Sequence, residues 1–335
     1  MKYVCAQPAT KYYAWQVDAM LHSFKKQNVN LQDVHIVCAI HGEVDDHFDK
    51  MSLKYPEAIF EYYEDTRKER DYISSIRPHI LQKHFDKYSD LYKSHVFYHD
   101  CDIALTKPLP TEKLTRDEIC YLSDTISYIG YDYIVSKGQD VLEKMLTIIA
   151  IDEETVKKNQ HHSGGAQYMI KNIDKFYWRD VERDCNRLFK DITQYNNKKK
   201  EEDPNYHEIQ IWSSDMWAVL WNLWKRGNQT MVIPELDFSW STSGVEQWDK
   251  NAIFHNAGVV SENNNQFFKA LYMKKFPPLN HDYEKTSCGH KYYEIVKEAL
   301  TLNIVKQEVV EENIVQVWNP DNNEYVNLTT GKQNT

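Results

Sequence analysis

Two aspartates lie two positions apart in the run HVFYHDCDIAL, residues 95–105. Asp100 and Asp102 follow a stretch that is typical of a buried strand, and the residues after them turn away along the surface. Two carboxylates this close repel each other unless a cation lies between them, and such oxygen ligands suit Mg²⁺ or Mn²⁺. The pair therefore predicts a divalent metal, which can hold a diphosphate and neutralise its charge as it leaves. A solvated strand end is the alternative.

Three other segments carry polar side chains that suit a substrate site. In SGGAQYMIKN, residues 163–172, two glycines allow a ligand to approach the backbone closely, and Ser163 and Gln167 offer neutral hydrogen bonds suited to sugar hydroxyls. A plain tight turn is the alternative. Asp215 in WSSDMWAVLW lies in the first turn of a helix, where it either stabilises the helix dipole or faces a reacting centre. His255 in IFHNAG can complete a metal site, although a lone histidine is also an ordinary polar core residue.

The first half of the chain alternates strand-like and helix-like segments. Strands are predicted for residues 2–7, 34–40, 58–64, 95–105 and 119–124, and helices for residues 12–27 and 75–88. This order is typical of a mostly parallel sheet with helices on both faces. Ligands bind such sheets at the carboxyl ends of the strands, so we expect several polar residues at one rim. These residues are Gln7, Asp100, Asp102 and Asp124.

The second half of the chain has a different pattern. A turn over residues 160–163 leads into a strand, helices are predicted for 173–192 and 211–227, strands for 230–235 and 252–258, and a charged loop for 196–205. The tail is predicted to hold a helix near 292–300 and a hairpin over 314–328 that turns at NPDNN. We predict one domain over residues 1–280, with a nucleotide-binding half (1–125) and a donor-sugar and acceptor half (126–280), followed by an appendage over 281–335.

Composition excludes some classes of function. The 335 residues are 41% hydrophobic and 27% charged, as expected for a globular protein with a core. The net charge of -10 provides no global basic field that would attract nucleic acid. The six scattered cysteines form no CxxC pair, which argues against a zinc site and predicts unpaired thiols in a reducing compartment. We find no membrane-spanning stretch and no signal-peptide pattern, so we expect a cytoplasmic protein without a membrane partner.

Taken in order, the motifs resemble those of glycosyltransferases of the GT-A fold, which use nucleotide sugars and a divalent metal. The order is an AQP loop after the first strand, the DCD strand end, SGGAQY, an acid on a helix and HNAG. More narrowly, RDYISSIRPHIL, FYHDCDIALTKPL, YIGYDYIVSKG and SGGAQYMIKN are similar to plant hydroxyproline O-arabinosyltransferases and peptidyl-serine galactosyltransferases, over about residues 1–270. The resemblance implies a Rossmann-like α/β fold, a UDP-sugar donor with arabinose or galactose favoured, and a retaining transfer.

The resemblance also implies a role for individual residues. The ligands of Mn²⁺ (or Mg²⁺) would be Asp100, Asp102 and His255, with the aspartates also holding the diphosphate. The uridine pocket would be lined by Gln7, Pro8 and Tyr13, and phosphate or ribose would contact Arg70 and Arg77. The donor sugar would contact Asp124, Gly164, Gly165 and Gln167. Asp215 would act with Gln167 at the reacting centre, as a charge stabiliser in a retaining enzyme or as a base in an inverting one.

The plant relatives are secretory and membrane-anchored, whereas this sequence shows neither an anchor nor a signal, so we expect a cytoplasmic acceptor. Enzymes of this kind occur in viruses and phages, some of which glycosylate hydroxymethylcytosine in their own DNA, including with arabinose. We therefore predict an acceptor hydroxyl on modified phage or viral DNA, in the host cytoplasm.

Local charge gives the DNA acceptor mixed support. Phosphate contacts need cations, and the basic clusters are Lys198–Lys200, Lys225 with Arg226, and Lys269 with Lys274 and Lys275. Trp240 and Trp248 suit stacking on a flipped base or a sugar ring, or packing in a core. The alternatives are the same chemistry on a protein or glycan hydroxyl, and a non-catalytic carbohydrate-binding protein. A nucleotidyltransferase is a weaker alternative, because AQPATKYY lacks a Gly-rich, basic phosphate loop.

Overall fold

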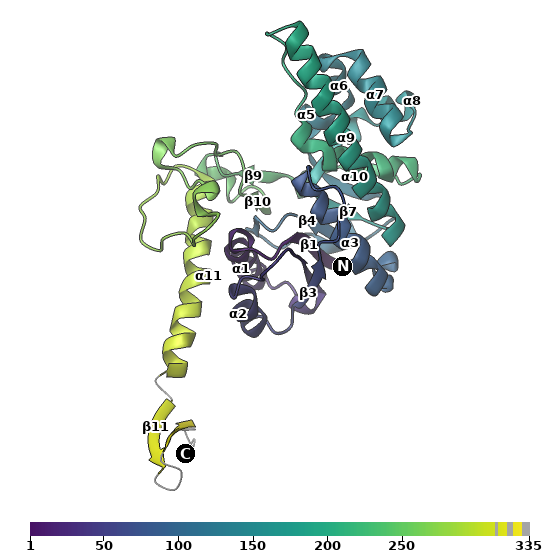
Figure 1. The fold of residues 1–335 in the computed structure, drawn as a ribbon. Helices are drawn as coiled ribbons and strands as arrows, with labels where there is room; N and C mark the ends of the chain where they lie inside the picture. Colours follow the sequence, from purple (N-terminus) through teal and green to yellow (C-terminus); the bar gives the residue numbers. More distant parts are fainter. Residues whose placement is uncertain (312–313, 320–323, 330–335) are drawn as a thin grey trace.

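The computed structural model describes residues 1–311, 314–319 and 324–329, with side chains described up to residue 301. A seven-stranded sheet forms its centre, in the order β3-β2-β1-β4-β7-β6-β8 (Figure 1). Its strands are β1 (Lys2–Pro8), β2 (Val34–Ile40), β3 (Ile59–Glu64), β4 (Val96–His99), β6 (Cys120–Asp124), β7 (Gly164–Ile170) and β8 (Thr230–Val232). Strand β7 runs antiparallel to β4 and β6, and the other pairs are parallel. The predicted mostly parallel sheet is therefore confirmed.

Helices cover both faces of this sheet, and the middle of β1, residues 3–6, is apolar at every position. Val4 and Ala6 belong to one core cluster, and Tyr3 and Cys5 belong to another. Successive side chains of a strand point to opposite faces, so a strand buried on both faces has no polar positions to alternate. The first cluster includes residues of α3 (Ile76–Lys87), α7 (Gln139–Ile149), α9 (Lys175–Glu202) and α10 (Ser214–Lys225). The second includes residues of α1 (Lys11–Lys26) and α2 (His47–Lys54).

Shorter helices complete this part of the chain. They are α4 (Thr111–Leu114), α5 (Ile126–Ile129), α6 (Tyr131–Lys137) and α8 (Glu153–Lys158).

The charged run expected as a loop over residues 196–205 is mostly helical, because α9 continues to Glu202. Ion pairs explain why this run stays helical. Lys198 lies one turn from Glu202, with nitrogen and oxygen 3.7 Å apart. Lys199 and Lys200 pair with Asp140 and Glu208, which lie outside α9, at 3.0 and 2.7 Å. The prediction was wrong because the opposite charges of this run pair with one another and with Asp140 and Glu208 instead of being solvated in a loop.

A second, three-stranded sheet has the order β5-β10-β9, formed by β5 (Ile103–Leu105), β10 (Ile253–His255) and β9 (Phe238–Trp240). Strand β10 runs antiparallel to β5 and parallel to β9. The single strand expected over residues 95–105 is therefore two strands in different sheets. Between them, Asp100–Asp102 leaves the large sheet, because the residues that follow pair with β10.

Two further strand predictions need adjustment. Strand β8 ends at Val232, because Pro234, which lacks an N–H group, begins a short 3₁₀ helix, η6 (Pro234–Leu236). Strand β9 was not predicted from the sequence.

The tail contains α11 (Cys288–Glu311), which is longer than the helix predicted near 292–300. Its residues Tyr292 and Val296 belong to a core cluster with Trp15 and Ala19 of α1, so the first part of α11 packs against the body of the protein. The strands β11 (Ile314–Asn319) and β12 (Glu324–Thr329) form the predicted antiparallel pair. The turn was predicted at NPDNN, residues 319–323, of which residues 320–323 lie outside the described residues. The boundary near residue 280 stays a prediction. Within the described part of the chain, we find no helix with the length and apolar character that crossing a membrane requires.

Candidate metal centre and adjoining cavities

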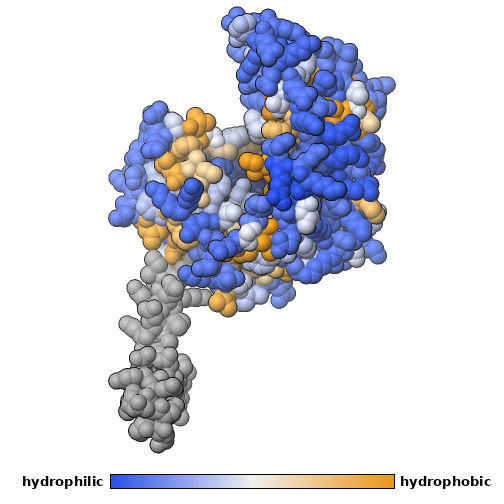
Figure 2. All heavy atoms as spheres, viewed as in Figure 1, coloured by the Kyte–Doolittle hydropathy of each residue, from blue (hydrophilic) through white to orange (hydrophobic). Residues whose placement is uncertain are grey.

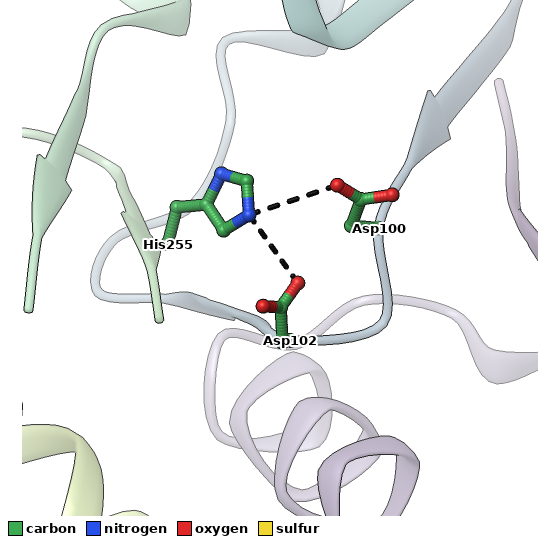
Figure 3. A group of neighbouring side chains, drawn as sticks. All are labelled: Asp100, Asp102 and His255. Atoms are coloured by element: carbon green, nitrogen blue, oxygen red, sulfur yellow. Dashed lines mark ion pairs between the residues drawn. The ribbon is translucent and has the colours of Figure 1, made fainter. Parts of the chain in front are cut away.

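Asp100, Asp102 and His255 come together although they are separated by about half of the chain (Figure 3). The aspartates lie in the β4–β5 loop and His255 ends β10, whose pairing with β5 sets His255 opposite Ile103. One ligand atom from each residue lies within 4.8 Å of the other two. His255 Nε2 is 3.3 Å from Asp102 Oδ1 and 3.6 Å from Asp100 Oδ2. The three side chains predicted as metal ligands therefore converge on one point.

Permanent charges surround this cluster. Lys269 pairs with Asp102, and Arg77 pairs with both Asp100 and Asp215. Burial would raise the pKa of Asp102, but the positive charge of Lys269 and the contact with His255 lower it below its ordinary value. Asp102 is therefore ionised at neutral pH. Three carboxylates and two permanent cations leave one net negative charge at the cluster, which suits a further cation.

The donor set also fits a metal. Two carboxylates and one imidazole are ligands that Mn²⁺ accepts, and Mg²⁺ takes the carboxylates. Asp102 and His255 are buried, whereas Asp100 is partly exposed, so the cluster remains open on one side. An open side is what a metal needs if it is to bind a substrate as well as the protein.

The first of two cavities that meet at this cluster lies at the carboxyl end of β1. It has a volume of about 160 Å³, and its walls include Gln7, Pro8, Tyr13 and Arg77. Gln7 is buried and donates its Nε2 to the Val37 carbonyl at 3.2 Å, while its Oε1 has no hydrogen-bond partner. A buried acceptor without a donor is costly, and a ligand N–H group could satisfy this oxygen if the Gln7 side chain turned it toward the cavity.

The second cavity has a volume of about 290 Å³ and a more aromatic lining. Its walls include Tyr128, Tyr168, Trp212, Asp215 and Trp240. Figure 2 shows the surface hollowed in this region, between the part that carries β9 and β10 and the part that carries α9 and α10. Both cavities are lined by the residues Ser74, Arg77, Asp100, Asp102 and Lys269. The metal cluster therefore lies at their junction.

Asp215 faces this cleft from the first turn of α10 and has donors on both oxygens. Tyr72 donates its hydroxyl to Oδ1 at 2.6 Å, and Arg77 Nη2 lies 2.5 Å from Oδ2. The Tyr72 hydroxyl also accepts the backbone N–H of Asp215 at 3.1 Å. Both alternatives for Asp215, a helix-dipole acid and a cleft carboxylate, are thus compatible with its position.

The glycines of SGGAQY serve packing instead of lining a cavity. A Cβ on Gly164 would lie 2.4 Å from the Leu122 Cβ, and one on Gly165 would lie 2.6 Å from the Met216 Cε. Neither glycine is among the residues that line the two cavities. The protein atoms that approach these glycines belong to neighbouring strands and to α10, and contact with the donor sugar stays a prediction.

Gln167 also lies outside the two cavities. Its side chain is fully buried and contacts Ser123 at 2.8 Å and His255 at 3.3 Å. In this structure it therefore lies behind His255 instead of beside a bound sugar.

Arg70 and Asp124 lie away from both cavities. Arg70 is exposed and pairs with Asp65 at 3.6 Å. Asp124 is exposed, and its Oδ1 accepts the backbone N–H of Ile126 at 3.0 Å.

Of the two tryptophans predicted to stack on a base or a sugar ring, only Trp240 lines the second cavity. The ring of Trp240 stacks on that of His255 at 6.1 Å, whereas Trp248 packs against Phe254 in a core cluster.

Sequence reasoning missed two residues of the cleft. Lys269 was expected in a surface cluster with Lys274 and Lys275, yet it pairs with Asp102. Tyr72 lies within the RDYISSIRPHIL segment, but no spacing rule connects it to Asp215, 143 positions later. Both contacts depend on long-range packing, and we find no local sequence signal for them.

No family model and no curated protein sequence matches this chain. Among solved structures, the apo form of the bifunctional glycosyltransferase WbbM gives a TM-score of 0.50 at 10% identity, covering 90% of this chain and 51% of that chain. The galactosyltransferase LgtC, in complex with donor and acceptor sugar analogues, gives 0.45 at 14% identity, covering 89% and 96%. GlyE from Streptococcus pneumoniae TIGR4, in its apo form, gives 0.42 at 10% identity, covering 92% and 64%.

The chain spans about half the length of the WbbM structure. At such low identity, the likeness shows the fold alone. That fold is an α/β arrangement with a mostly parallel mixed sheet flanked by helices, as in GT-A glycosyltransferases. The predicted fold class is confirmed.

Proposed function

We propose that this chain is a metal-dependent glycosyltransferase that moves a sugar from a UDP-sugar to a hydroxyl acceptor. The observation that carries this proposal is the position of Asp100, Asp102 and His255 at the junction of two cavities. A nucleoside in the first cavity and a sugar in the second would bring the diphosphate that joins them to the ligand cluster. A metal site in the middle of a divided cleft suits a diphosphate-linked substrate better than a single compact one.

The first cavity has the chemistry for the nucleoside. The unpartnered Oε1 of Gln7 is a buried acceptor, and the imide N–H of uracil is a matching donor. Pro8 and Tyr13 supply apolar and aromatic surface on which a base can pack. These features support uridine as the base, in agreement with the sequence prediction.

The junction has the chemistry for the diphosphate. A bound Mn²⁺ or Mg²⁺ would act there as a Lewis acid for the leaving diphosphate. Arg77 and Lys269 add positive charge on the protein side, and both line the two cavities. When phosphate oxygens arrive, these cations can exchange part of their contact with the aspartates for contact with the substrate.

Asp215 suits charge stabilisation better than proton abstraction. Both of its oxygens already accept hydrogen bonds, from Tyr72 and Arg77, so the carboxylate is held as a fixed negative charge beside the second cavity. A general base needs an oxygen that can take a proton from the acceptor. Its pairing with Arg77 suits a carboxylate that stays charged, which agrees with the retaining course that the sequence resemblance implies. That resemblance also favours arabinose or galactose as the donor sugar.

The acceptor predicted from the sequence is hydroxymethylcytosine in DNA, and the basic clusters give it little support. Lys198–Lys200 pair with acidic side chains, and Lys269 faces the metal cluster. Arg226 pairs with Asp174 and Asp180 at 2.9 and 3.3 Å. Cations engaged in such pairs are poorly placed to bind the phosphates of a duplex.

A groove beside the second cavity favours the alternative acceptor, a protein or glycan hydroxyl. It has a volume of about 420 Å³, and Ser74 and Trp212 line both spaces. Its described lining residues include Asn197, Gln210 and Glu208 but no lysine or arginine. Trp212 is 55% exposed, and an exposed indole beside neutral amides suits a sugar ring or a neutral peptide.

A screen of UDP-sugars with Mn²⁺ tests the proposal, with UDP release as the signal. We expect hydrolysis of UDP-arabinose or UDP-galactose that stops in excess chelator and is lost in Asp102→Asn. Binding of free sugars without any UDP release would instead favour the carbohydrate-binding alternative. Pyrophosphate release from UTP and a sugar phosphate would favour the nucleotidyltransferase.

The acceptor is tested separately, with the active donor held constant. Hydroxymethylated oligonucleotide, a hydroxyproline peptide and neutral oligosaccharides are compared at low salt. Transfer to the oligonucleotide that falls steeply with added salt would support the DNA acceptor. Transfer to the peptide or an oligosaccharide, reduced in Trp212→Ala but not in Phe176→Ala, would support the alternative, because Phe176 is an exposed aromatic of α9 that does not line the groove.

A further inference from the structure

The imidazole of His255 uses its two nitrogens in different directions. Its Nε2 faces Asp102 and Asp100, and its Nδ1 lies 3.3 Å from the amide group of Gln167. Gln167 and Ser123 behind it are both completely buried. Because water does not reach this side of the ring, the protein alone decides whether Nδ1 carries a proton.

The hydrogen bonds behind Gln167 fix the direction of the chain of donors. In the structure as it stands, Ser123 Oγ lies 2.8 Å from Gln167 Oε1 and 2.7 Å from the Leu236 carbonyl, and Gln167 Nε2 faces His255 Nδ1. A serine hydroxyl has one proton, and a carbonyl oxygen only accepts. The single proton of Ser123 cannot serve both the Leu236 carbonyl and Gln167 Oε1. Exchanging the amide oxygen and nitrogen of Gln167 lets Ser123 donate to Leu236 and accept from Gln167, with the amide oxygen toward His255. The orientation of a glutamine amide is decided by such partners.

In this arrangement three hydrogen bonds run in one direction. His255 Nδ1–H donates to the Gln167 oxygen, the Gln167 N–H donates to Ser123, and the Ser123 hydroxyl donates to Leu236. Without this exchange, the amide nitrogen would donate to Nδ1, and the proton of a neutral His255 would lie on Nε2, between the ring and two carboxylates. A nitrogen that carries a proton cannot bind a metal.

We propose that Gln167 is a positioning residue that keeps the proton of His255 on Nδ1, so that Nε2 presents its lone pair to a metal between the two aspartates. This inference rests on the metal site of the proposed function, but not on sugar transfer. It gives Gln167 a role through His255, in place of the predicted contact with the donor sugar.

The backbone explains how Gln167 reaches His255. The register between β6 and β7 shifts between Leu122 and Ser123, where Gly165 instead of Gln167 stands opposite Ser123. Ala166, just before Gln167, has a φ of 66°, a left-handed conformation that a non-glycine residue adopts only where the surroundings impose it. This irregularity interrupts the β6–β7 hydrogen-bond ladder next to Gln167, the residue that contacts the metal ligand His255.

Mn²⁺ binding to the full chain, measured by calorimetry, tests the role of Gln167. Gln167→Met keeps a similar volume but has no strong acceptor for Nδ1–H, so we expect Mn²⁺ to bind about 10- to 100-fold more weakly. Gln167→Glu keeps an oxygen at that place and is expected to bind Mn²⁺ within a few-fold of the wild type. If Gln167 served packing alone, the Mn²⁺ affinity of both variants would fall in proportion to the loss in their melting temperatures. Unchanged Mn²⁺ affinity in Gln167→Met would overturn the proposal.

A second measurement uses the wild-type protein and does not depend on the folding of a variant. With ¹⁵N-labelled histidine and Zn²⁺ as a diamagnetic probe, nitrogen chemical shifts identify which ring nitrogen carries the proton. The His255 signals are assigned by their absence in His255→Gln. We expect the proton on Nδ1 and the metal on Nε2, and the opposite assignment would contradict the proposal. Because neither measurement involves a sugar, a failure of glycosyl transfer can be told apart from a failure of this inference.

Discussion

Asp18 and Asp102 each contact a histidine and a lysine, yet only Asp102 lies at the junction of the two cavities. In the first cluster, the carboxylate of Asp18 in α1 lies 2.8 Å from His47 Nε2 and accepts hydrogen bonds from Lys54 Nζ at 2.6 Å and from the Tyr55 hydroxyl at 3.0 Å. In the second, the cleft cluster, Asp102 lies between His255 and Lys269. The residue types are the same, so residue type does not distinguish a site from a structural network.

Access and charge distinguish the two clusters. The Asp18 side chain is fully buried, and Asp18 lines none of the cavities described above. The cleft cluster opens into two cavities and holds three carboxylates against two permanent cations. An excess of negative charge that is open to a ligand can bind a cation, whereas a closed cluster that satisfies its own groups stabilises the fold.

The largest effect is expected when an acid of the cleft cluster is removed, which tests whether that cluster binds a metal. In Asp102→Asn, we expect Mn²⁺-dependent UDP-sugar hydrolysis to fall on the order of 10³-fold, because one charged ligand of the metal is lost. The melting temperature should change little, since Lys269 is partly exposed and can turn to water. Full activity of this variant in excess chelator would refute the metal role.

Removing the acid of the closed cluster should lower stability and leave metal binding unchanged. Asp18→Asn leaves the buried Lys54 and His47 without their carboxylate, so we expect a loss of about 3–5 kcal/mol in the free energy of unfolding. Mn²⁺ affinity, measured below the melting temperature, should stay at the wild-type value. A variant with wild-type stability and weakened Mn²⁺ binding would break the distinction between the two clusters.

Asp215 separates chemistry from metal binding within the cleft. In Asp215→Asn, we expect sugar transfer to fall about 10²-fold, because a negative charge beside the sugar is lost. Mn²⁺ affinity should remain within a few-fold of the wild type, because Asp215 is not among the three ligands. If the variant transferred sugar at the wild-type rate, Asp215 would be no more than an acid in the first turn of a helix.

The smallest effect is the pH dependence of the closed cluster. Burial would raise the pKa of Asp18, but His47 and Lys54 lower it below the ordinary value of 3.8. The folded state then binds fewer protons than the unfolded state near that pH, so this stabilisation is present above pH 4 and is lost as the pH falls below it. The difference in unfolding free energy between wild type and Asp18→Asn should shrink below pH 4, by at most about 1.4 kcal/mol per pH unit. A constant difference from pH 5 to pH 3 would contradict the assignment.

The same contrast explains what the sequence could predict. Strands β1 and β2 contain apolar runs, and β3 is rich in aromatic and β-branched residues, so local pattern was enough to place them and to predict the sheet. Asp100 and Asp102 were found because they follow such a run directly. These features depend on residues that are neighbours in the sequence.

The rest of the site depends on partners far away in the chain. The division of residues 95–105 into β4 and β5 is decided by β10, about 150 positions later. Lys269 and Tyr72 enter the cleft through contacts of the same range. The position of Gln167 follows from the register shift between β6 and β7, which the sequence SGGAQY does not reveal. Side-chain chemistry can be predicted from the sequence, whereas the partner of each side chain depends on the tertiary fold.

The central claim is that the paired aspartates and His255 hold a divalent ion beside a uridine nucleotide. Crystals soaked with Mn²⁺ and UDP, with diffraction recorded at the manganese absorption edge, test it most directly. We expect an anomalous peak in contact with Asp100, Asp102 and His255, with uracil in the cavity next to Gln7. An empty cluster under these conditions, or manganese and nucleotide bound elsewhere, would contradict the claim.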